Sequence, residues 1–298
     1  MADVEPNWEW YRSFVCVLET GSLSAAGRAM GMTQPTVGRH IDSLEAALNL
    51  KLFTRSFDGF APTDAALELK PYAATLASTA AALRRVASSH GDGVRGTVRL
   101  TASEVVGVEV LPPILTALRR QHPELVIELV LSNRVDDLLR READIAVRMV
   151  RPTQDALVAQ RVGGIELGFH AHERYLAEHG TPRTMADLKQ HTLIGFDTET
   201  AFIRQVQARY PALTRAALAF RADSDLANLA ALRAGYGIGI CHVVLGKRDP
   251  SLVRVLAKDF SPLLDTWIAM HEDLRDSARC AVTFAALAAG LRDYIPSA

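Results

Sequence analysis

Polar side chains near residue 35 have the types needed to contact a nucleic acid. Gln34, Thr36, Arg39 and His40 place amide, hydroxyl, guanidinium and imidazole groups in one short stretch. A glutamine can pair with adenine through two hydrogen bonds, an arginine can pair with guanine or phosphate, and a threonine can reach a phosphate. The set therefore predicts contacts in the major groove of duplex DNA, provided that one exposed helix face carries it.

A helix from Thr33 to about Leu48 would provide that face. Thr33 is placed as an N-cap, and Pro35 falls in the first turn, where its missing N–H has no cost. Apolar residues recur on the other face at steps of four, three and four: Val37, Ile41, Leu44 and Leu48. This spacing predicts a buried stripe behind the polar residues.

Two shorter elements precede this helix. Apolar residues follow helical spacing near the start of the chain: Trp8, Tyr11, Phe14, Val15 and Leu18. Gly21 is placed to end that helix, and Ser22 can cap a short helix that runs to about Met30. Gly31 then suits the tight turn between crossed helices, so the sequence predicts a helix-turn-helix.

After the recognition helix, residues 51–55 alternate as in a strand, and residues 56–59 predict a turn. This shape is typical of a wing, which would bring Arg55 to a phosphate or to the adjacent minor groove. Residues 21–57 hold four basic and two acidic side chains, although the net charge of the whole chain is −1. The residues alone also leave open a small helical domain with a solvated polar face.

The run GSLSAAGRAMGMTQPTVGRHIDSLEAALNLKLFTRS resembles the N-terminal signature of LysR-type transcriptional regulators. The resemblance implies a winged helix-turn-helix whose recognition helix runs from Thr33 to about Leu48. It implies that the following residues lie nearest the DNA: Ser24, Thr33, Gln34, Pro35, Thr36, Arg39 and Arg55. Gly38 departs from the family, which usually has serine there, so we expect a lost phosphate contact and a slightly weaker helix.

A long helix from Thr63 to about Ser89 would follow the wing. Its apolar seam recurs at alternating steps of three and four: Leu69, Tyr72, Leu76, Thr79, Leu83 and Val86. The same seam on a second copy of the chain could bury these apolar side chains, which predicts a homodimer. The alternative is that the helix packs on its own domain. Pro71 should kink this helix, and the family commonly has proline there, whereas Ala66 replaces a frequent glycine. Residues 90–93 predict a hinge.

Residues 94–298 alternate predicted strands and helices. Strands are predicted at 97–102, 126–131 and 144–148, with helices at 111–121 and through Leu138 and Leu139. This order predicts a mostly parallel sheet with helices on both faces. A similar set of elements repeats at 164–261, and a strand near Ala269 and a helix at 278–294 return to the first set.

We therefore expect an α/β protein with three parts. A winged helix-turn-helix occupies residues 1–62, a linker and dimerisation helix residues 63–90, and a two-lobed effector-binding domain residues 94–298. The last part resembles LysR-type effector domains more loosely, which implies a periplasmic-binding-protein-like architecture. Lobe one is expected at about 94–163 and 266–298, and lobe two at about 164–265. The resemblance also implies a homotetramer built by contacts between effector domains.

Ligands of open α/β sheets bind beyond the carboxyl ends of the strands. Ser103 follows the first strand and Arg148 ends another, so these two residues are suited to a small anionic or polar metabolite. Residues expected to end strands in the second lobe complete the candidate effector site: Phe196, Asp197, Asp223, Ser224 and Cys241. Two alternatives stay open: Asp223 and Ser224 could simply cap a helix that begins at Asp225, and Arg148 could be a surface charge.

Composition limits the remaining classes of protein. Hydrophobic residues make up 49% and charged residues 22% of 298 residues, which is typical of two globular domains. We expect a cytoplasmic protein without a membrane span or a signal peptide. Three scattered cysteines predict neither a disulfide framework nor a zinc site, and we expect no metal and no cofactor.

Two other functions are weighed against DNA binding. An enzyme would need Cys241 paired with His242, or Ser103 with a distant histidine, but adjacent residues of a strand point to opposite faces. No nucleophile elbow, P-loop or dinucleotide fingerprint occurs. A thiol redox sensor of the same family would use Cys241 and Cys280, which lack the spacing of a reactive pair. We therefore expect a regulator and not an enzyme.

Overall fold

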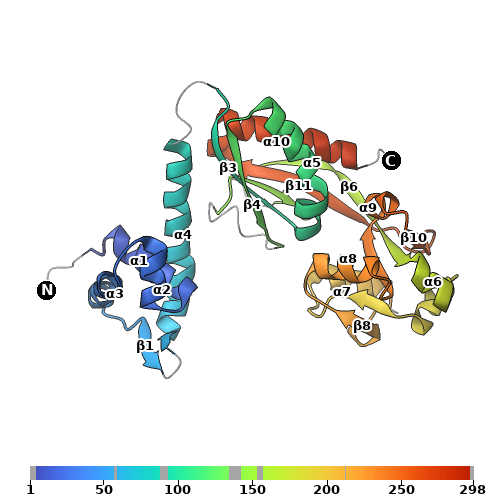
Figure 1. Ribbon diagram of the computed structural model, residues 1–298, viewed down its shortest axis with the longest axis horizontal. Helices are drawn as coiled ribbons and strands as arrows, with labels where there is room; N and C mark the ends of the chain where they lie inside the picture. Colours follow the sequence, from blue (N-terminus) through green and yellow to red (C-terminus); the bar gives the residue numbers. More distant parts are fainter. Residues whose placement is uncertain are drawn as a thin grey trace. The chain divides into compact units, whose positions relative to one another are not determined.

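The computed structural model describes residues 5–56, 59–87, 93–133, 142–152, 157–211 and 213–295. The chain forms two compact units, the first built from residues 1–90 and the second from most of residues 91–298. Figure 1 shows the first unit in blue and cyan, and the second in green to red.

The first unit consists of four helices and a two-stranded sheet among its described residues. The elements are α1 Trp8–Thr20, α2 Leu23–Met30, α3 Gln34–Leu48, β1 Phe53–Ser56, β2 Gly59–Pro62 and α4 Asp64–Ala87. Strands β1 and β2 are antiparallel, with Arg55 opposite Phe60. The strand predicted from residue 51 begins two residues later, at Phe53.

The helix ends lie where local hydrogen bonds predict them. Gly21 closes α1 with a φ of 72°, and Gly31 closes α2 with a φ of 67°. The Ser22 hydroxyl accepts from the N–H of Ala25, and the Thr33 hydroxyl accepts from the N–H of Thr36. The predicted helix-turn-helix boundaries are therefore confirmed.

Helix α4 has 24 residues and includes Pro71. The Thr63 hydroxyl caps it by accepting from the N–H of Ala66. Its predicted seam is only partly covered, since Tyr72 is 72% exposed, Leu76 47% and Leu83 67%. The predicted hinge at 90–93 lies outside the described residues, apart from Gly93.

The second unit is built on one large sheet. Its strands are β3 Gly96–Ala102, β4 Leu125–Leu131, β5 Ile145–Arg148, β6 Leu157–His172, β7 Leu193–Gly195, β8 Leu218–Arg221, β9 Ile238–His242, β10 Leu252–Val255 and β11 Leu263–His271. The strand order is β4-β3-β5-β11-β6-β9-β7-β8, and β10 pairs with β6. Pairs β3–β4, β3–β5, β7–β8 and β7–β9 are parallel, whereas the pairs of β6 and β11 are antiparallel. The predicted strands β3, β4 and β5 are therefore parallel as expected, but the sheet as a whole is mixed and not mostly parallel.

Helices flank this sheet. They are the π-helical turn η1 Val106–Val110, α5 Leu111–Gln121, α6 Glu173–His179, α7 Ala201–Arg209, α8 Asp225–Arg233, α9 Val243–Arg248 and α10 Ala278–Tyr294, with short 3₁₀ turns at Met185–Gln190, Arg215–Ala217 and Glu272–Leu274. Helix α10 packs beside α5, β3 and β11 (Figure 1). The helix predicted through Leu138 and Leu139 lies outside the described residues.

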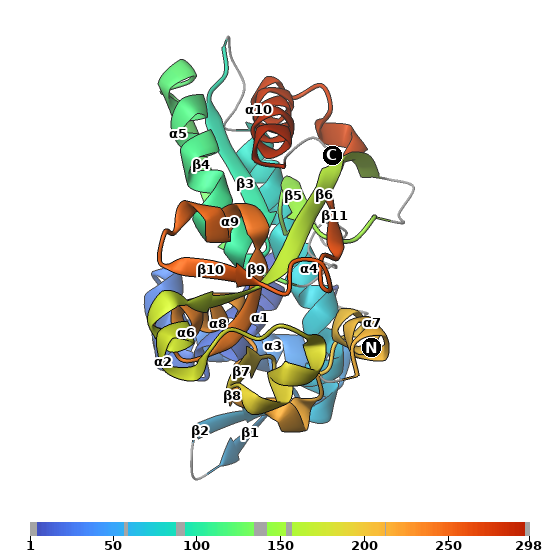
Figure 2. The same ribbon diagram turned by 90° about the vertical axis from the view of Figure 1, so that its right-hand side faces the viewer.

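Separate hydrophobic cores divide the second unit into two lobes. The core of lobe one includes Leu100, Val147 and Leu287, and that of lobe two includes Phe169, Ile238 and Phe260. Strands β6 and β11 run from one lobe to the other (Figure 2). The lobe boundaries expected near residues 163 and 266 therefore fall within these two strands, where the register shifts between Thr266 and Trp267.

Candidate nucleic-acid interface and effector site

The N-terminal turn of α3 presents the residues that the sequence singled out. Thr33, Gln34, Pro35 and Arg39 are exposed, and Thr36 is half-buried. The hydroxyl of the exposed Ser24 on α2 donates to Oε1 of Gln34 at 3.0 Å, which ties the two helices together. An amide oxygen has two lone pairs, so Gln34 can keep this bond and still pair with a base. The first unit thus places Ser24 and Gln34 side by side.

His40 has a different environment from its polar neighbours. Its Nδ1 lies 2.8 Å from the hydroxyl of the buried Ser13 on α1. This contact directs the imidazole towards α1, although the sequence grouped it with Gln34 and Arg39 on the exposed face. The side chain of Arg55 lies outside the described part of the structure.

A buried carboxylate joins α3 to the wing. Glu45 is 7% exposed, and its Oε1 accepts from the backbone N–H groups of Leu52 at 2.8 Å and Phe53 at 3.2 Å. Its Oε2 contacts Nζ of Lys51. Burial raises the pKa of Glu45, but these hydrogen bonds together outweigh burial and lower it. From the sequence, Glu45 entered only as one of the two acids of residues 21–57, because nothing near it in the chain indicates that its carboxylate is buried.

In the second unit, Ser103 and Arg148 lie at the same edge of the sheet. Strands β3 and β5 are parallel neighbours, with Ala102 opposite Val147. Arg148 is 6% exposed and its Nη2 donates to the Thr101 hydroxyl at 2.8 Å. Ser103 is half-buried. The pair expected to bind an anion is therefore brought together, with the guanidinium held against β3.

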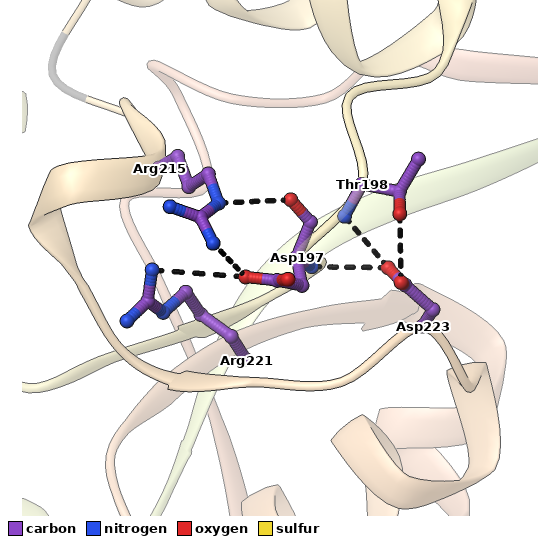
Figure 3. A network of polar contacts seen from close by, with 5 residues as sticks. All are labelled: Asp197, Thr198, Arg215, Arg221 and Asp223. Carbon is purple, nitrogen blue, oxygen red and sulfur yellow. Dashed lines mark hydrogen bonds and ion pairs between the residues drawn. The ribbon is translucent and has the colours of Figure 1, made fainter.

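The acids predicted in lobe two bind partners within the lobe. Figure 3 shows that the carboxylate of Asp223 accepts from the N–H of Asp197 at 3.1 Å and from the N–H and hydroxyl of Thr198, both at 2.8 Å. The carboxylate of Asp197 accepts from Nη2 of Arg215 at 2.6 Å and lies 3.6 Å from Nη1 of Arg221. This network fixes the loop after β7, which also carries the half-buried Phe196.

Ser224 is the N-cap of α8, as one interpretation of the sequence had it. Its hydroxyl accepts from the N–H of Ala227 at 3.3 Å. The same hydroxyl donates to Oε2 of Glu104, which follows β3, at 2.8 Å. Ser224 therefore lies at the junction of the two lobes, whereas Asp223 binds the loop.

Cys241 is buried, with Sγ 3.3 Å from Nδ1 of His170 on β6. Burial raises the pKa of the Cys241 thiol to about 12, so its thiolate is scarce at neutral pH. His242 contacts the hydroxyl of Tyr294 through Nδ1 at 3.0 Å, so the adjacent Cys241 and His242 have separate partners. Cys280 belongs to the core of lobe one.

Metal sites and membrane-spanning helices are both absent from the described ranges. No group of three or more His, Cys, Asp and Glu side chains among these residues is arranged to hold a metal ion. Within the same ranges, every helix is too short or too polar to cross a membrane.

Comparison with protein families matches both units. Residues 8–67 match the family of bacterial regulatory helix-turn-helix proteins of the LysR type, and residues 91–292 match the LysR substrate-binding domain. The chain belongs to the LysR family. The second match alone covers more than half of the sequence, and the order of the two matched regions is the order of the two units.

Curated relatives of this LysR-family chain are transcriptional regulators by name. An HTH-type transcriptional regulator of Xanthomonas campestris pv. campestris is 28% identical over 178 residues, which are 60% of this chain and 52% of the relative. A probable HTH-type transcriptional regulator, LtrA of Klebsiella pneumoniae, is 28% identical over 191 residues, 64% of this chain and 62% of LtrA. The matches thus span between 52% and 62% of the length of these relatives.

Solved LysR-family structures have the same fold over nearly the whole chain. The full-length Vibrio cholerae virulence activator AphB covers 94% of this chain and 98% of its own, with a TM-score of 0.62 and 22% identity. Full-length CbnR in complex with its target DNA covers 97% of this chain and 99% of its own, with a TM-score of 0.66 and 18% identity. At these identities the likeness shows the fold, which is the predicted winged helix-turn-helix followed by an α/β effector domain.

Proposed function

We propose that the chain is a sequence-specific DNA-binding transcriptional regulator whose DNA binding is modulated by a small molecule held between the lobes of the second unit. The observation that carries the proposal is the exposed N-terminal turn of α3, where Ser24 steadies Gln34 beside Thr36. Amide and hydroxyl groups on an exposed helix start are suited to base edges and phosphates. The names of the LysR-family relatives support this function, and a cytoplasmic location follows from it.

We further propose that the protein binds DNA as a homodimer through α4, and that contacts between effector domains make a homotetramer. The exposed apolar side chains Tyr72, Leu76 and Leu83 support the dimer, since a stripe of this kind is rarely left in water. A two-fold dimer would read an inverted repeat whose half-sites lie about 34 Å apart, or a multiple of that distance.

Selection of duplexes from a random pool, followed by fluorescence anisotropy at several salt concentrations, tests DNA binding. Gln34→Ala should weaken binding by about 1–3 kcal/mol and relax the preference at one base pair. Arg39→Ala should weaken binding to all DNA sequences alike, because a phosphate contact carries no sequence information. It should also make the affinity depend less steeply on salt concentration. Arg120→Ala, an exposed change in α5, is the control. Failure to enrich any duplex, or wild-type affinity in both variants, would refute the proposed interface.

For the effector we propose a small anionic or polar metabolite at Ser103 and Arg148. Their shared sheet edge supports this site, whereas Asp197, Asp223, Ser224 and Cys241 already have partners within the second unit. A metabolite library screened for thermal stabilisation would find the ligand. Arg148→Ala should abolish that stabilisation, while Thr101→Val keeps the guanidinium and should retain it. Equal responses of both variants and the wild type would place the effector elsewhere.

A further inference from the structure

Two acidic side chains of lobe one contact a single helix of lobe two. Glu104 Oε2 accepts from the Ser224 hydroxyl at 2.8 Å and from the N–H of Leu226 at 3.4 Å, at the start of α8. Glu109 accepts from both Nη1 and Nη2 of Arg233, at 2.6 and 3.1 Å, and Arg233 is the last residue of α8. Residues 104–109 therefore hold α8 at both of its ends.

Glu109, which binds Arg233, lies in a segment of unusual backbone conformation. Glu109 lies in the π-helical turn η1, a conformation that is rare and is frequent at functional sites. The turn also packs closely on lobe one, since a Cβ added to Gly107 would meet Leu131 at 2.3 Å. Val105, at its start, packs against the second apolar cluster of lobe two, which includes Leu229 and Leu232.

Charge and further contacts strengthen the same junction. The hydrogen bond from Arg233, which outweighs burial, lowers the pKa of Glu109, so its carboxylate is ionised at neutral pH. The backbone carbonyl of Glu109 accepts from Nη1 of Arg248 on α9 at 3.4 Å. Asn133, after β4, donates to Asp225 at 3.0 Å. Charge-assisted, bidentate pairs such as Glu109–Arg233 are the stronger hydrogen bonds in proteins.

A further contact between the lobes lies close to the strands that connect them. His242 bonds Tyr294, and its strand pairs directly with β6 at Leu167. Such contacts move little when two lobes rotate about β6 and β11. The contacts of residues 104–109 are made instead with α8, so a rotation of the lobes would have to break them.

We propose that residues 104–109 are a latch that holds the two lobes of the second unit together, with the Glu109–Arg233 pair as its strongest contact. The inference extends the proposed function, because an effector that separates the lobes must break this pair. The strength of the latch then sets how readily an effector can separate the two lobes. Its strength is a property of the protein alone, so it is measurable without DNA and without a ligand.

Distances between spin labels on the two lobes test the latch in the full chain. Labels are placed at Ala117→Cys in α5 and Glu178→Cys in α6, both exposed positions, in a Cys16→Ser background that leaves Cys241 and Cys280 buried. Labelled chains are mixed with an excess of unlabelled chains, so that each assembly carries one labelled pair. The unaltered latch should give one narrow distance distribution.

Breaking the Glu109–Arg233 pair should change that distribution. Glu109→Arg and Arg233→Glu should each raise the population of open lobes by about tenfold, since a pair of this kind contributes one factor of ten or more. The double variant should be narrower than either single variant but not as narrow as the unaltered protein, because Asp249 lies 3.7 Å from Arg233 and Arg248 contacts the Glu109 carbonyl. The milder Glu109→Gln should open the lobes if a reversal does not fold. Asp265→Arg breaks the exposed Arg161–Asp265 pair between β6 and β11 and is the control.

Narrow, unchanged distributions in both single variants would overturn the latch, as would a double variant as open as the singles. Neither outcome bears on DNA binding, which the anisotropy experiment tests separately. Conversely, a protein that binds no duplex could still show the latch.

Discussion

Replacing Glu45 by alanine should detach the wing from α3 without touching any residue of the expected DNA face. The substitution removes the acceptor of two backbone N–H groups, those of Leu52 and Phe53, at the start of the wing. Both residues are buried, so water cannot easily take the place of the carboxylate. The first unit should therefore lose stability, and the wing should lose its fixed position.

The size of the effect follows from the two orphaned donors. A buried donor without a partner costs about 1–3 kcal/mol, so two of them give about 2–6 kcal/mol. Lys51 adds little, because its side chain is 80% exposed, and such ion pairs contribute about 0–1 kcal/mol. Glu45→Gln keeps an oxygen acceptor and should cost about 1 kcal/mol. A loss of several kcal/mol is a large share of the stability of a small domain.

Urea unfolding followed by tryptophan fluorescence measures these changes. Trp8 and Trp10 lie in the first unit and Trp267 in the second, so a Trp267→Phe background reports on the first unit alone. The pKa of Glu45 is lowered in the folded protein, so its contribution is present above the ordinary pKa of glutamate and is lost as the pH falls through the folded value. If Glu45→Ala cost no more than Lys51→Met, the two backbone bonds would not stabilise the wing.

Three other changes have defined outcomes. Gly38→Ala should stabilise the first unit by about 0.5–1 kcal/mol in the same assay, because an added Cβ meets only Leu23 Cδ1 at 3.8 Å and glycine is a poor helix former; destabilisation would show a hidden clash. Burial lowers the pKa of His242 to about 4, below its value of about 6.5 in an unfolded chain, so the second unit should lose about 3 kcal/mol as the pH falls from about 6.5 to about 4. His242→Gln should remove that slope in urea titrations at stepped pH, and a slope that persists would assign it to other groups. Leu76→Asp should shift the protein towards monomer in sedimentation experiments, since an unpaired charge would be buried in the α4 seam; an unchanged sedimentation coefficient would move the dimer contact away from α4.

The local features of the first unit were predictable because each depends on neighbours in the sequence. Gly21, Ser22, Gly31 and Thr33 end or begin helices through bonds within four residues, and the sequence shows all the atoms involved. The Ser24–Gln34 contact joins two helices that are adjacent in the sequence, so it too depends on residues only ten positions apart. Strong resemblance over the same stretch made the family identifiable.

Features that depend on distant residues were not predictable. The mixed sheet arises because β11 returns from the end of the chain to pair with β5 and β6, and no local pattern encodes the direction of that pairing. Asp223 looked like a helix cap, yet its carboxylate bonds residues 197 and 198 on another loop. Glu104 and Glu109 meet α8 across more than one hundred residues of sequence.

The π-helical turn η1 makes the Glu109–Arg233 contact sensitive to chain length as well as to side-chain type. A π turn carries one residue more than an α-helix needs, and each residue of an α-helix turns the next by about 100°. Loss of one codon between Val106 and Val110 would let η1 continue directly into α5 as an α-helix, and the acid would then face away from Arg233. Single-codon deletions and insertions, and not only substitutions, are therefore a route by which related genes can gain or lose the contact while keeping both charges.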